Sequence, residues 1–218
     1  MRAMILAAGL GTRMRPLTNH TPKPLLKVGG KPLIVWHIER LKAAGFREIV
    51  INVAYLGDQI MDYLGDGSHY GVRFFFSDER DKGALETAGG IIRALPLLSE
   101  TFLVVNGDIW TDYPYDVDFQ LPKGKQAHLV LVDNPKHHPK GDFPLYGDLS
   151  KLYTFSGIAY YHKSFFEGFK EGKRPLAPLL FNALAENLLS CEHHGGEWYD
   201  IGTVERLQYL DSLLSRNA

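Results

Sequence analysis

Short apolar segments alternate with longer amphipathic segments through the first half of the chain. The apolar segments are rich in β-branched and aromatic residues, as strands are, whereas the others carry apolar residues near helical spacing. This alternation predicts a parallel sheet whose strands are joined by crossover helices. We expect strands at residues 4–8, 48–55, 72–77 and 101–106, and helices at 32–44, 57–64 and 85–98.

The second half of the chain has a different pattern, in which a polar loop with several prolines separates two expected strands. The absence of an internal repeat, low-complexity tract or linker predicts one domain over residues 1–218. Its fold class is α/β, a Rossmann-like three-layer sandwich with a mostly parallel central sheet, whose later strands form a substrate-side lobe. We expect strands at 127–132, 153–161 and 189–193, and helices at 176–189 and 204–214.

Composition and charge narrow the class of protein. The 218 residues are 45% hydrophobic and 22% charged, with a formal net charge of −1, which argues against a protein that coats nucleic acid. The single cysteine, Cys191, cannot form an internal disulfide and fits a reducing compartment. The sequence has neither a signal-peptide pattern nor an apolar run of membrane-spanning length. We therefore expect a cytoplasmic enzyme or binding domain, with no nucleic-acid or membrane partner.

Positive charge is concentrated at the start of the chain. Residues 1–38 contain six Lys or Arg and neither Asp nor Glu, and the first acidic residue is Glu39. A local cationic field on an otherwise neutral protein suits a small, highly charged anion better than a long polymer.

The stretch LAAGLGTRMRPLT at residues 6–18 places a glycine-rich loop directly after the first expected strand. It has no G-x-x-x-x-G-K-[ST] string, and Met14 stands where the third glycine of a dinucleotide-binding G-x-G-x-x-G would be. A tight turn that needs two glycines is one interpretation. The other is an anion-binding concavity of backbone N–H groups, to which Arg13 and Lys23 add positive charge. Prolines on either side of Lys23 would hold it in place.

This stretch, continued by PKPLL at residues 22–26, resembles the N-terminal signature of the sugar-1-phosphate nucleotidyltransferases, which have the nucleotide-diphospho-sugar transferase fold. The resemblance covers essentially the whole chain, because later motifs fall in the family's order. It implies a nucleotide-binding half at 1–112 and a sugar-binding half at 113–218. It also implies that Arg13 holds the departing pyrophosphate and Lys23 the phosphate being joined, which makes both residues catalytic. The residues expected to bind the nucleotide are Ala8, Gly9, Gly11, Thr12, Arg13, Lys23, Glu79 and Leu85.

The same resemblance implies that two carboxylates far apart in the sequence bind Mg²⁺. Asp108 follows an apolar strand in the motif NGD, and Asp200 lies in WYDIGT, which is similar to the family's W-x-D-[IV]-G-T. A carboxylate at the end of a parallel strand is well placed for a ligand, and hard oxygen ligands suit Mg²⁺. Local interpretations remain: Asp108 as a turn aspartate, and WYDIG as the approach to a helix capped by Thr203. The cap and the metal site are compatible with each other.

The base and sugar contacts are less typical of the family. Glu79 stands where many members have a glutamine that contacts the pyrimidine, and Ala84 where many have glycine. The segments NPKHHPKGDF at 134–143 and YTFSGI at 153–158 are similar to the branch that acts on N-acetylmuramic acid 1-phosphate in cell-wall recycling. The residues expected to contact the sugar phosphate are Asn106, Asp142, Gly157 and Asp200.

The resemblance therefore predicts a Mg²⁺-dependent uridylyltransferase that joins UTP to N-acetylmuramic acid α-1-phosphate and releases pyrophosphate. Another sugar 1-phosphate or phosphocholine, with TTP, CTP or GTP as donor, remains open, as does a non-catalytic nucleotide-sugar sensor. The presence of Arg13, Lys23 and both aspartates favours an enzyme over a sensor. The histidine pairs at 137–138 and 193–194 do not predict a zinc site, because neighbouring residues on a strand face opposite sides. The sequence does not indicate an oligomeric state.

Overall fold

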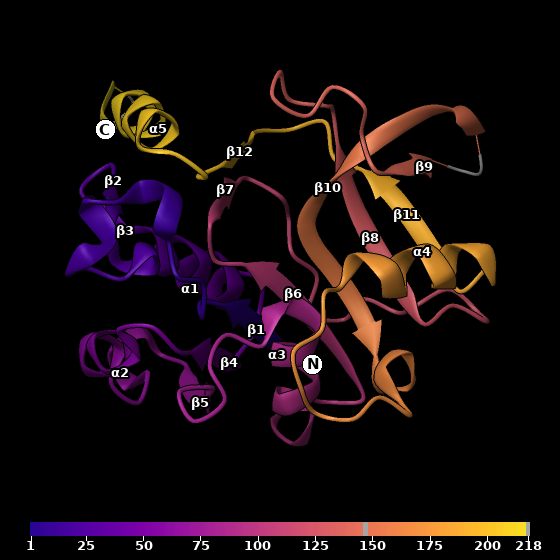
Figure 1. Cartoon of the computed structure of the whole chain (residues 1–218), viewed down its shortest axis with the longest axis horizontal. Helices are drawn as coiled ribbons and strands as arrows, with labels where there is room; N and C mark the ends of the chain where they lie inside the picture. The colour runs from indigo at the N-terminus through magenta and orange to yellow at the C-terminus, as the bar shows by residue number, and fades with distance from the viewer. Residues whose placement is uncertain (146–147, 217–218) are drawn as a thin grey trace.

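The central sheet contains the strands predicted from the sequence, in the order β11-β8-β10-β6-β1-β4-β5, with β9 paired to β10 (Figure 1). The structure, a computed structural model, describes residues 1–145 and 148–216. β1, β4, β5 and β6 run parallel to one another, whereas β10 runs antiparallel to both β6 and β8. The mostly parallel sheet is therefore confirmed, and the reversed strand β10 joins its early strands to its late ones. The strands of this sheet are β1 (Arg2–Leu6), β4 (Glu48–Val53), β5 (Arg73–Asp78), β6 (Thr101–Asn106), β8 (Ala127–Val132), β9 (Phe143–Leu145), β10 (Asp148–His162) and β11 (Leu189–His193).

Helices cover both faces of this sheet, and successive residues of β1 show which helix covers which face. Ala3 and Ile5 belong to the same buried cluster as Ile38 of α1. Met4, between them, belongs to the cluster that contains Ile91 of α3. The three-layer sandwich is thus confirmed, and none of the described helices is both long and apolar enough to cross a membrane. The helices are α1 (Leu33–Ala43), α2 (Gly57–Leu64), α3 (Glu86–Ala94), α4 (Ala177–Ala185) and α5 (Val204–Arg216).

A third buried cluster attaches the last helix to the beginning of the chain, beside β2 and β3 (Figure 1). Leu210 of α5 packs there with Met14, which follows the glycine-rich loop. The carboxylate of Asp211 accepts a hydrogen bond of 2.8 Å from the backbone N–H of Gly29. Because of this packing, the segment that precedes α5, which includes Ile201, lies beside the glycine-rich loop.

The structure differs from the sequence prediction mainly at the ends of elements. The expected helix at 85–98 is divided into α3 and a 3₁₀ turn at Leu95–Leu97, because Pro96 has no N–H to continue the helix. α4 ends at Ala185, and Asn187 then adopts the left-handed conformation common after helices, with φ of 58°. Elements that were not predicted are the strand β9, the paired strands β7 (Ile109–Thr111) and β12 (Trp198–Asp200), the pair β2 (Lys27–Val28) and β3 (Lys31–Pro32), and 3₁₀ turns at Thr12–Met14, Leu17–Asn19, Lys23–Leu25, Ser68–Tyr70 and Lys163–Phe166.

His37 of α1 makes the stability of the fold depend on pH. It is buried, and this burial, reinforced by the charge of Arg40, lowers its pKa to about 4. The unfolded chain has a His pKa of about 6.5, so between these values it binds a proton that the folded chain does not. We expect the free energy of unfolding to fall by up to about 3 kcal/mol from this residue as the pH drops from about 7 to about 4.

Urea unfolding at several pH values measures this contribution. His37→Leu should show a smaller loss of stability in acid than the wild type, because it has no imidazole to protonate. His20→Asn, at an exposed position, should keep the wild-type pH dependence. Equal pH dependence in the wild type and His37→Leu would contradict the assignment.

Candidate active site

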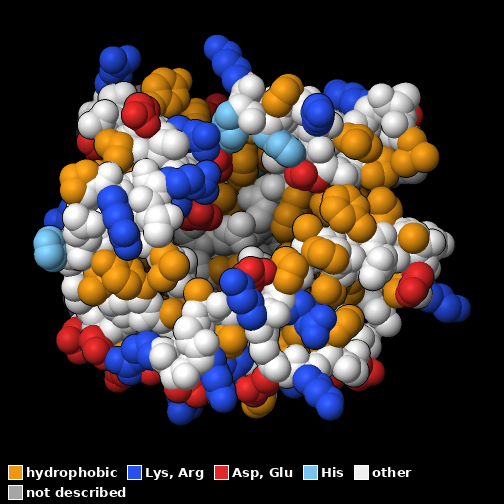
Figure 2. All heavy atoms as spheres, in the orientation of Figure 1, with side chains coloured by type: hydrophobic (Ala, Val, Ile, Leu, Met, Phe, Trp, Pro, Cys, Tyr) orange, Lys and Arg blue, Asp and Glu red, His pale blue; other side chains and the backbone are white. Residues whose placement is uncertain are grey.

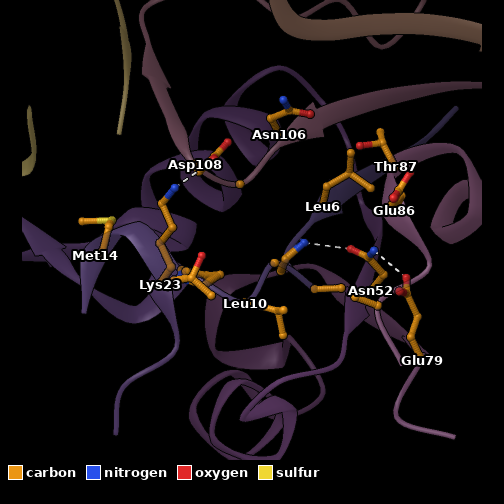
Figure 3. A pocket seen from close by; sticks show the side chains of 18 of the residues that line it. Leu6, Leu10, Met14, Lys23, Asn52, Glu79, Glu86, Thr87, Asn106 and Asp108 are labelled. Atoms are coloured by element: carbon orange, nitrogen blue, oxygen red, sulfur yellow. Dashed lines mark hydrogen bonds and ion pairs between the residues drawn. The ribbon is translucent and has the colours of Figure 1, made fainter. Parts of the chain in front are cut away.

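A cavity of about 400 Å³ lies at the carboxyl ends of β1, β4 and β6 (Figure 3). Ligand sites in open α/β sheets lie at this edge, because the loops that follow parallel strands converge there. All eight residues predicted to bind a nucleotide lie on its wall. Its lining consists of residues 6–14, 84–87 and 106–108 together with Lys23, Pro24, Asn52, Glu79 and Gly202.

The glycine-rich loop is a tight turn and a cavity wall at the same time. Gly11 has a φ of +61°, and a Cβ at this position would lie 2.9 Å from the Cγ2 of Thr18. The hydroxyl of Thr18 donates a hydrogen bond of 2.7 Å to the carbonyl of Gly11, which closes the turn. The tight turn is therefore present, and the anion-binding role of the loop stays a prediction. The structure places Ala8, Gly9, Gly11, Thr12 and Arg13, all predicted to bind the nucleotide, on the cavity wall.

Lys23 is a nearly buried cation at the edge of this cavity, with 9% of the residue exposed. It is the first residue of a 3₁₀ turn and is flanked by Pro22 and Pro24. These prolines restrict the backbone on both sides of Lys23, as the sequence predicts. Its Nζ donates to Oδ2 of Asp108 at 2.8 Å (Figure 3). The structure therefore brings a predicted catalytic cation and a predicted metal ligand into direct contact.

Asp200 reaches the same region through the pairing of β12 with β7. Asp200 pairs with Ile109, and the N–H of Ile201 donates to the carbonyl of Asp108 at 2.8 Å. The carboxylate of Asp200 forms an ion pair with Arg206 of α5. Its other oxygen lies 3.1 Å from Nε2 of His137. Two aspartates far apart in the sequence are thus adjacent along one pair of strands.

The donor set at these aspartates fits Mg²⁺. Both carboxylates are partly exposed, and no cluster of three or more Asp, Glu, His or Cys suited to a metal occurs among residues 1–145 and 148–216. Mg²⁺ is commonly bound by one or two carboxylates and completed by water and substrate phosphates. Thr203 accepts a hydrogen bond of 3.3 Å from the N–H of Arg206, so the predicted helix cap is present beside the aspartate. Asp200 itself is not among the residues that line the cavity, whereas Gly202 is.

Glu79 is held at the back of the cavity by Asn52, whose side chain bridges two strand ends (Figure 3). Asn52 accepts from the N–H of Ala7 at 2.7 Å and donates to Oε1 of Glu79 at 2.7 Å. Oε2 of Glu79 accepts from the N–H of Leu85 at 3.3 Å. Glu79 is 1% exposed, and this burial raises the pKa of its carboxyl group. Both carboxylate oxygens are therefore already engaged by the protein.

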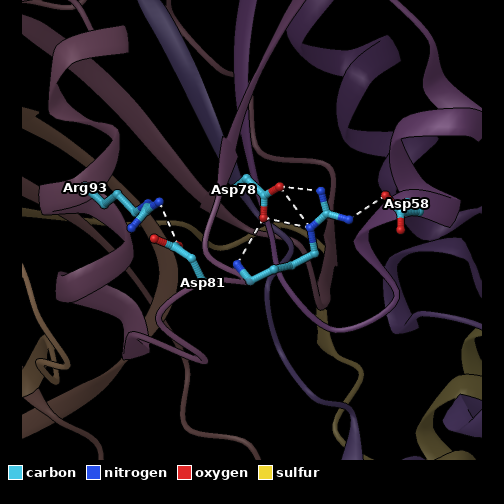
Figure 4. A network of polar contacts seen from close by, with 5 residues as sticks. Asp58, Asp78, Asp81 and Arg93 are labelled. Atoms are coloured by element: carbon cyan, nitrogen blue, oxygen red, sulfur yellow. Dashed lines mark hydrogen bonds and ion pairs between the residues drawn. The ribbon is translucent and has the colours of Figure 1, made fainter.

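Ion pairs hold the loop that carries Glu79 (Figure 4). Arg80 bridges Asp78, at the end of β5, to Asp58 of α2. Further along, Arg93 of α3 contacts Asp81 at 2.9 Å. These pairs anchor the loop to helices on both faces of the sheet, so its inner residues stay against the cavity.

A second cavity of about 530 Å³ adjoins the first. The two cavities share Glu86, Thr87 and Asn106. Glu86 has a φ of +61°, a left-handed conformation that is costly for a residue with a side chain. Of the residues predicted to contact a sugar phosphate, Asn106 and Asp142 line this cavity, whereas Asp200 does not.

Gly157 lies against the side chain of Asn106, which lines the second cavity. It is not on the described wall, but a Cβ at this position would lie 2.5 Å from Nδ2 of Asn106. Its φ of +84° also favours glycine. Gly157 therefore provides the space in which the Asn106 side chain lies, and its expected contact with a sugar phosphate stays a prediction.

Two adjacent histidines contact the two aspartates that are predicted to bind the sugar phosphate. Nε2 of His138 lies 2.9 Å from Oδ1 of Asp142, whose Oδ2 accepts from the N–H of Phe155 at 2.9 Å. His137 makes the corresponding contact with Asp200. Figure 2 shows histidine side chains at the upper rim of a hollow, with basic and acidic side chains on its left and hydrophobic side chains on its right. The site is thus polar toward the glycine-rich loop and apolar toward α4.

The raised pKa of Glu79 predicts a pH dependence of the free energy of unfolding that can be measured. Because its pKa is raised in the folded chain, the unfolded chain releases the proton first, and stability falls as the pH rises above about 4.5. Glu79→Gln should not show this loss, so its stability relative to wild type should rise between about pH 4.5 and 7. Urea unfolding measures the difference, and exposed Glu186→Gln serves as the control. If the free energies of unfolding of Glu79→Gln and wild type differed by a constant amount across that range, the pKa of Glu79 would not be raised.

Comparison with known proteins agrees with this geometry. The family profile described as "Nucleotidyl transferase" matches residues 2–144. The N-acetylmuramate alpha-1-phosphate uridylyltransferase of Neisseria meningitidis serogroup B is 53% identical over 98% of each chain. The UTP–glucose-1-phosphate uridylyltransferase of Synechocystis is 30% identical over 99% of this chain and 64% of its own length. A solved CTP:phosphocholine cytidylyltransferase of Streptococcus pneumoniae superposes with a TM-score of 0.73 at 27% identity, over 98% of each chain.

The profile match spans more than half of the chain, and the Neisseria relative aligns along nearly all of it. The chain therefore belongs to the sugar-1-phosphate nucleotidyltransferases of the nucleotidyl transferase family.

Proposed function

We propose that this protein transfers a uridylyl group from UTP to N-acetylmuramic acid α-1-phosphate, forming UDP-N-acetylmuramic acid and pyrophosphate. The observation that carries the proposal is the 53% identity, over 98% of each chain, to the uridylyltransferase of Neisseria meningitidis. The arrangement of two adjoining cavities supports it, because a nucleotidyl transfer needs a donor and an acceptor side by side. The reaction would return a cell-wall sugar to the nucleotide-sugar pool, as in peptidoglycan recycling.

The proposed step is an in-line displacement at the α-phosphorus of UTP. An oxygen of the sugar 1-phosphate forms the new bond to phosphorus, and the bond to pyrophosphate breaks. The attacking oxygen is already an anion, so no general base is required, and positioning and charge stabilisation carry the step. The triphosphate would lie in the first cavity and the sugar in the second, with the acceptor phosphate near Asn106 and Thr87 where they meet.

The cations of the first cavity would hold the phosphates. Arg13, on the glycine-rich loop, would bind the departing pyrophosphate through its planar guanidinium. Lys23 would bind the phosphate being joined, as a point charge held by its two prolines. Asp108 and Asp200 would hold Mg²⁺, which when bound would offset negative charge on the phosphate oxygens.

Related activities define the alternatives. The Synechocystis relative is named for glucose 1-phosphate, and the solved cytidylyltransferase is named for phosphocholine and CTP. A non-catalytic sensor is disfavoured by the presence of Arg13, Lys23, Asp108 and Asp200 around one site.

Pyrophosphate release with each of UTP, TTP, CTP and GTP, crossed against a panel of sugar 1-phosphates and phosphocholine, tests the proposal. We expect UTP with N-acetylmuramic acid 1-phosphate to give the highest kcat/KM, by about 100-fold over glucose 1-phosphate. A different preferred pair would retain the chemistry and replace the substrate. Tight triphosphate binding without release in any combination would identify a sensor.

The carboxylates can be tested separately. Asp108→Asn and Asp200→Asn should each lower kcat by about 100-fold or more, because each removes charge from the group that would hold the metal. Excess EDTA should abolish turnover of the wild type, and added Mg²⁺ should restore it. Exposed Asp118→Asn is the matched control and should retain wild-type turnover. Near-normal turnover of either variant in saturating Mg²⁺ would contradict the metal assignment.

A further inference from the structure

The second cavity has an apolar wall that a plain hexose does not need. Of the eleven residues that line it, seven are apolar, and they come from β9, β10, α4 and the segment before α4. Its polar residues are Glu86, Thr87, Asn106 and Asp142. Asp142 is already engaged by His138 and by the N–H of Phe155. Hydroxyl groups pressed against such a wall would lose hydrogen bonds to water without gaining new ones.

Three phenylalanines form the central part of this wall. Phe143 is buried, and its ring stacks on Phe181 with centroids 5.1 Å apart and an interplanar angle of 21°. On the other side its ring meets Phe155 edge to face, at 6.3 Å. Phe181 of α4 is 48% exposed. The stack of Phe143 and Phe181 lines the cavity, and part of it remains accessible to a ligand.

The position of the wall indicates what it would contact. The cavity joins the first one through Asn106, Thr87 and Glu86, so a sugar whose phosphate lies at that junction would extend toward α4. Methyl-bearing substituents on that sugar would remove apolar surface of the phenylalanines from water.

Resting on the proposed function, we propose that Phe181, stacked on Phe143, is a specificity-determining residue that selects a sugar phosphate with acetamido and lactyl substituents over an unsubstituted hexose phosphate. The two substituents place methyl groups against the aromatic wall, and a hexose hydroxyl cannot replace that contact. Discrimination by an apolar pocket of this kind is about 10- to 200-fold per methylene-sized group.

Binding of the product nucleotide sugars tests this without relying on turnover. Dissociation constants of UDP-N-acetylmuramic acid and UDP-glucose are measured by titration calorimetry, in Mg²⁺ buffer, for the wild type, Phe181→Ala and Phe181→Leu. The wild type should bind UDP-N-acetylmuramic acid more tightly. Phe181→Ala should weaken that complex about tenfold and change the UDP-glucose complex by less than about twofold, whereas Phe181→Leu should retain most of the preference.

Phe169→Ala is the matched control, because Phe169 is a comparably exposed phenylalanine at 39% that is not among the residues lining the cavity. Thermal unfolding of each variant verifies that the fold is retained. An unchanged ratio of the two dissociation constants in folded Phe181→Ala would overturn the proposal, as would a wild type without preference. Failure of the wild type to turn over N-acetylmuramic acid 1-phosphate, with the binding pattern intact, would remove the proposed function and leave the role of Phe181 standing.

Discussion

The hydrogen bonds between β7 and β12 are the interaction on which the rest of the site depends. β7 follows the apolar strand β6 directly, whereas β12 lies near the other end of the chain. The bond from the N–H of Ile201 to the carbonyl of Asp108 sets the position of one aspartate relative to the other. The packing of α5 on Met14 and Val28 then fixes the same segment against the glycine-rich loop. The glycine-rich loop, the carboxylates of Asp108 and Asp200, and α5 thus form one assembly.

Charge in this assembly is balanced within the protein. Lys23 lies against Asp108, and Arg206 lies against Asp200. A nearly buried lysine without a partner would be expensive, because its charge would lose hydration. The carboxylates thus hold the cations in place within the site. Under the proposed function, a triphosphate would meet side chains already held in position, which lowers the entropic cost of binding.

The sequence predicted those strands and helices in which apolar residues recur at a regular spacing. Segments such as EIVINVAY are apolar enough to identify buried strands, and the parallel order follows from the helices between them. The pair of β7 and β12 could not be predicted, because strands of three residues have no measurable alternation. The predicted nucleotide-binding residues of the glycine-rich motif lie together on the wall of one cavity, because their position depends mainly on the local chain.

Other site residues were missed because their contacts are distant in the sequence. Asn52 had one visible signal, a polar residue inside an apolar strand, but its partners are 45 and 27 residues away. His137 and His138 belong to the motif NPKHHPKGDF and do not predict a zinc site, but their contacts with Asp200 and Asp142 depend on how the loop before β9 folds. Phe181 looks like any apolar residue of an amphipathic helix. Only the stack on Phe143 shows that it faces a cavity.

The register of β1 determines both the packing of the core and the geometry of the first cavity. Strand side chains point to opposite faces in turn, so a slip of one residue would exchange Met4 with its neighbours between the two cores. The same slip would move the N–H of Ala7 away from Asn52, and with it the support of Glu79. A chain in the wrong register would therefore lose its packing and its nucleotide pocket together. A one-residue register slip in β1 would consequently expose apolar surface as well as disrupt the cavity, rather than leave a stable fold with a damaged site.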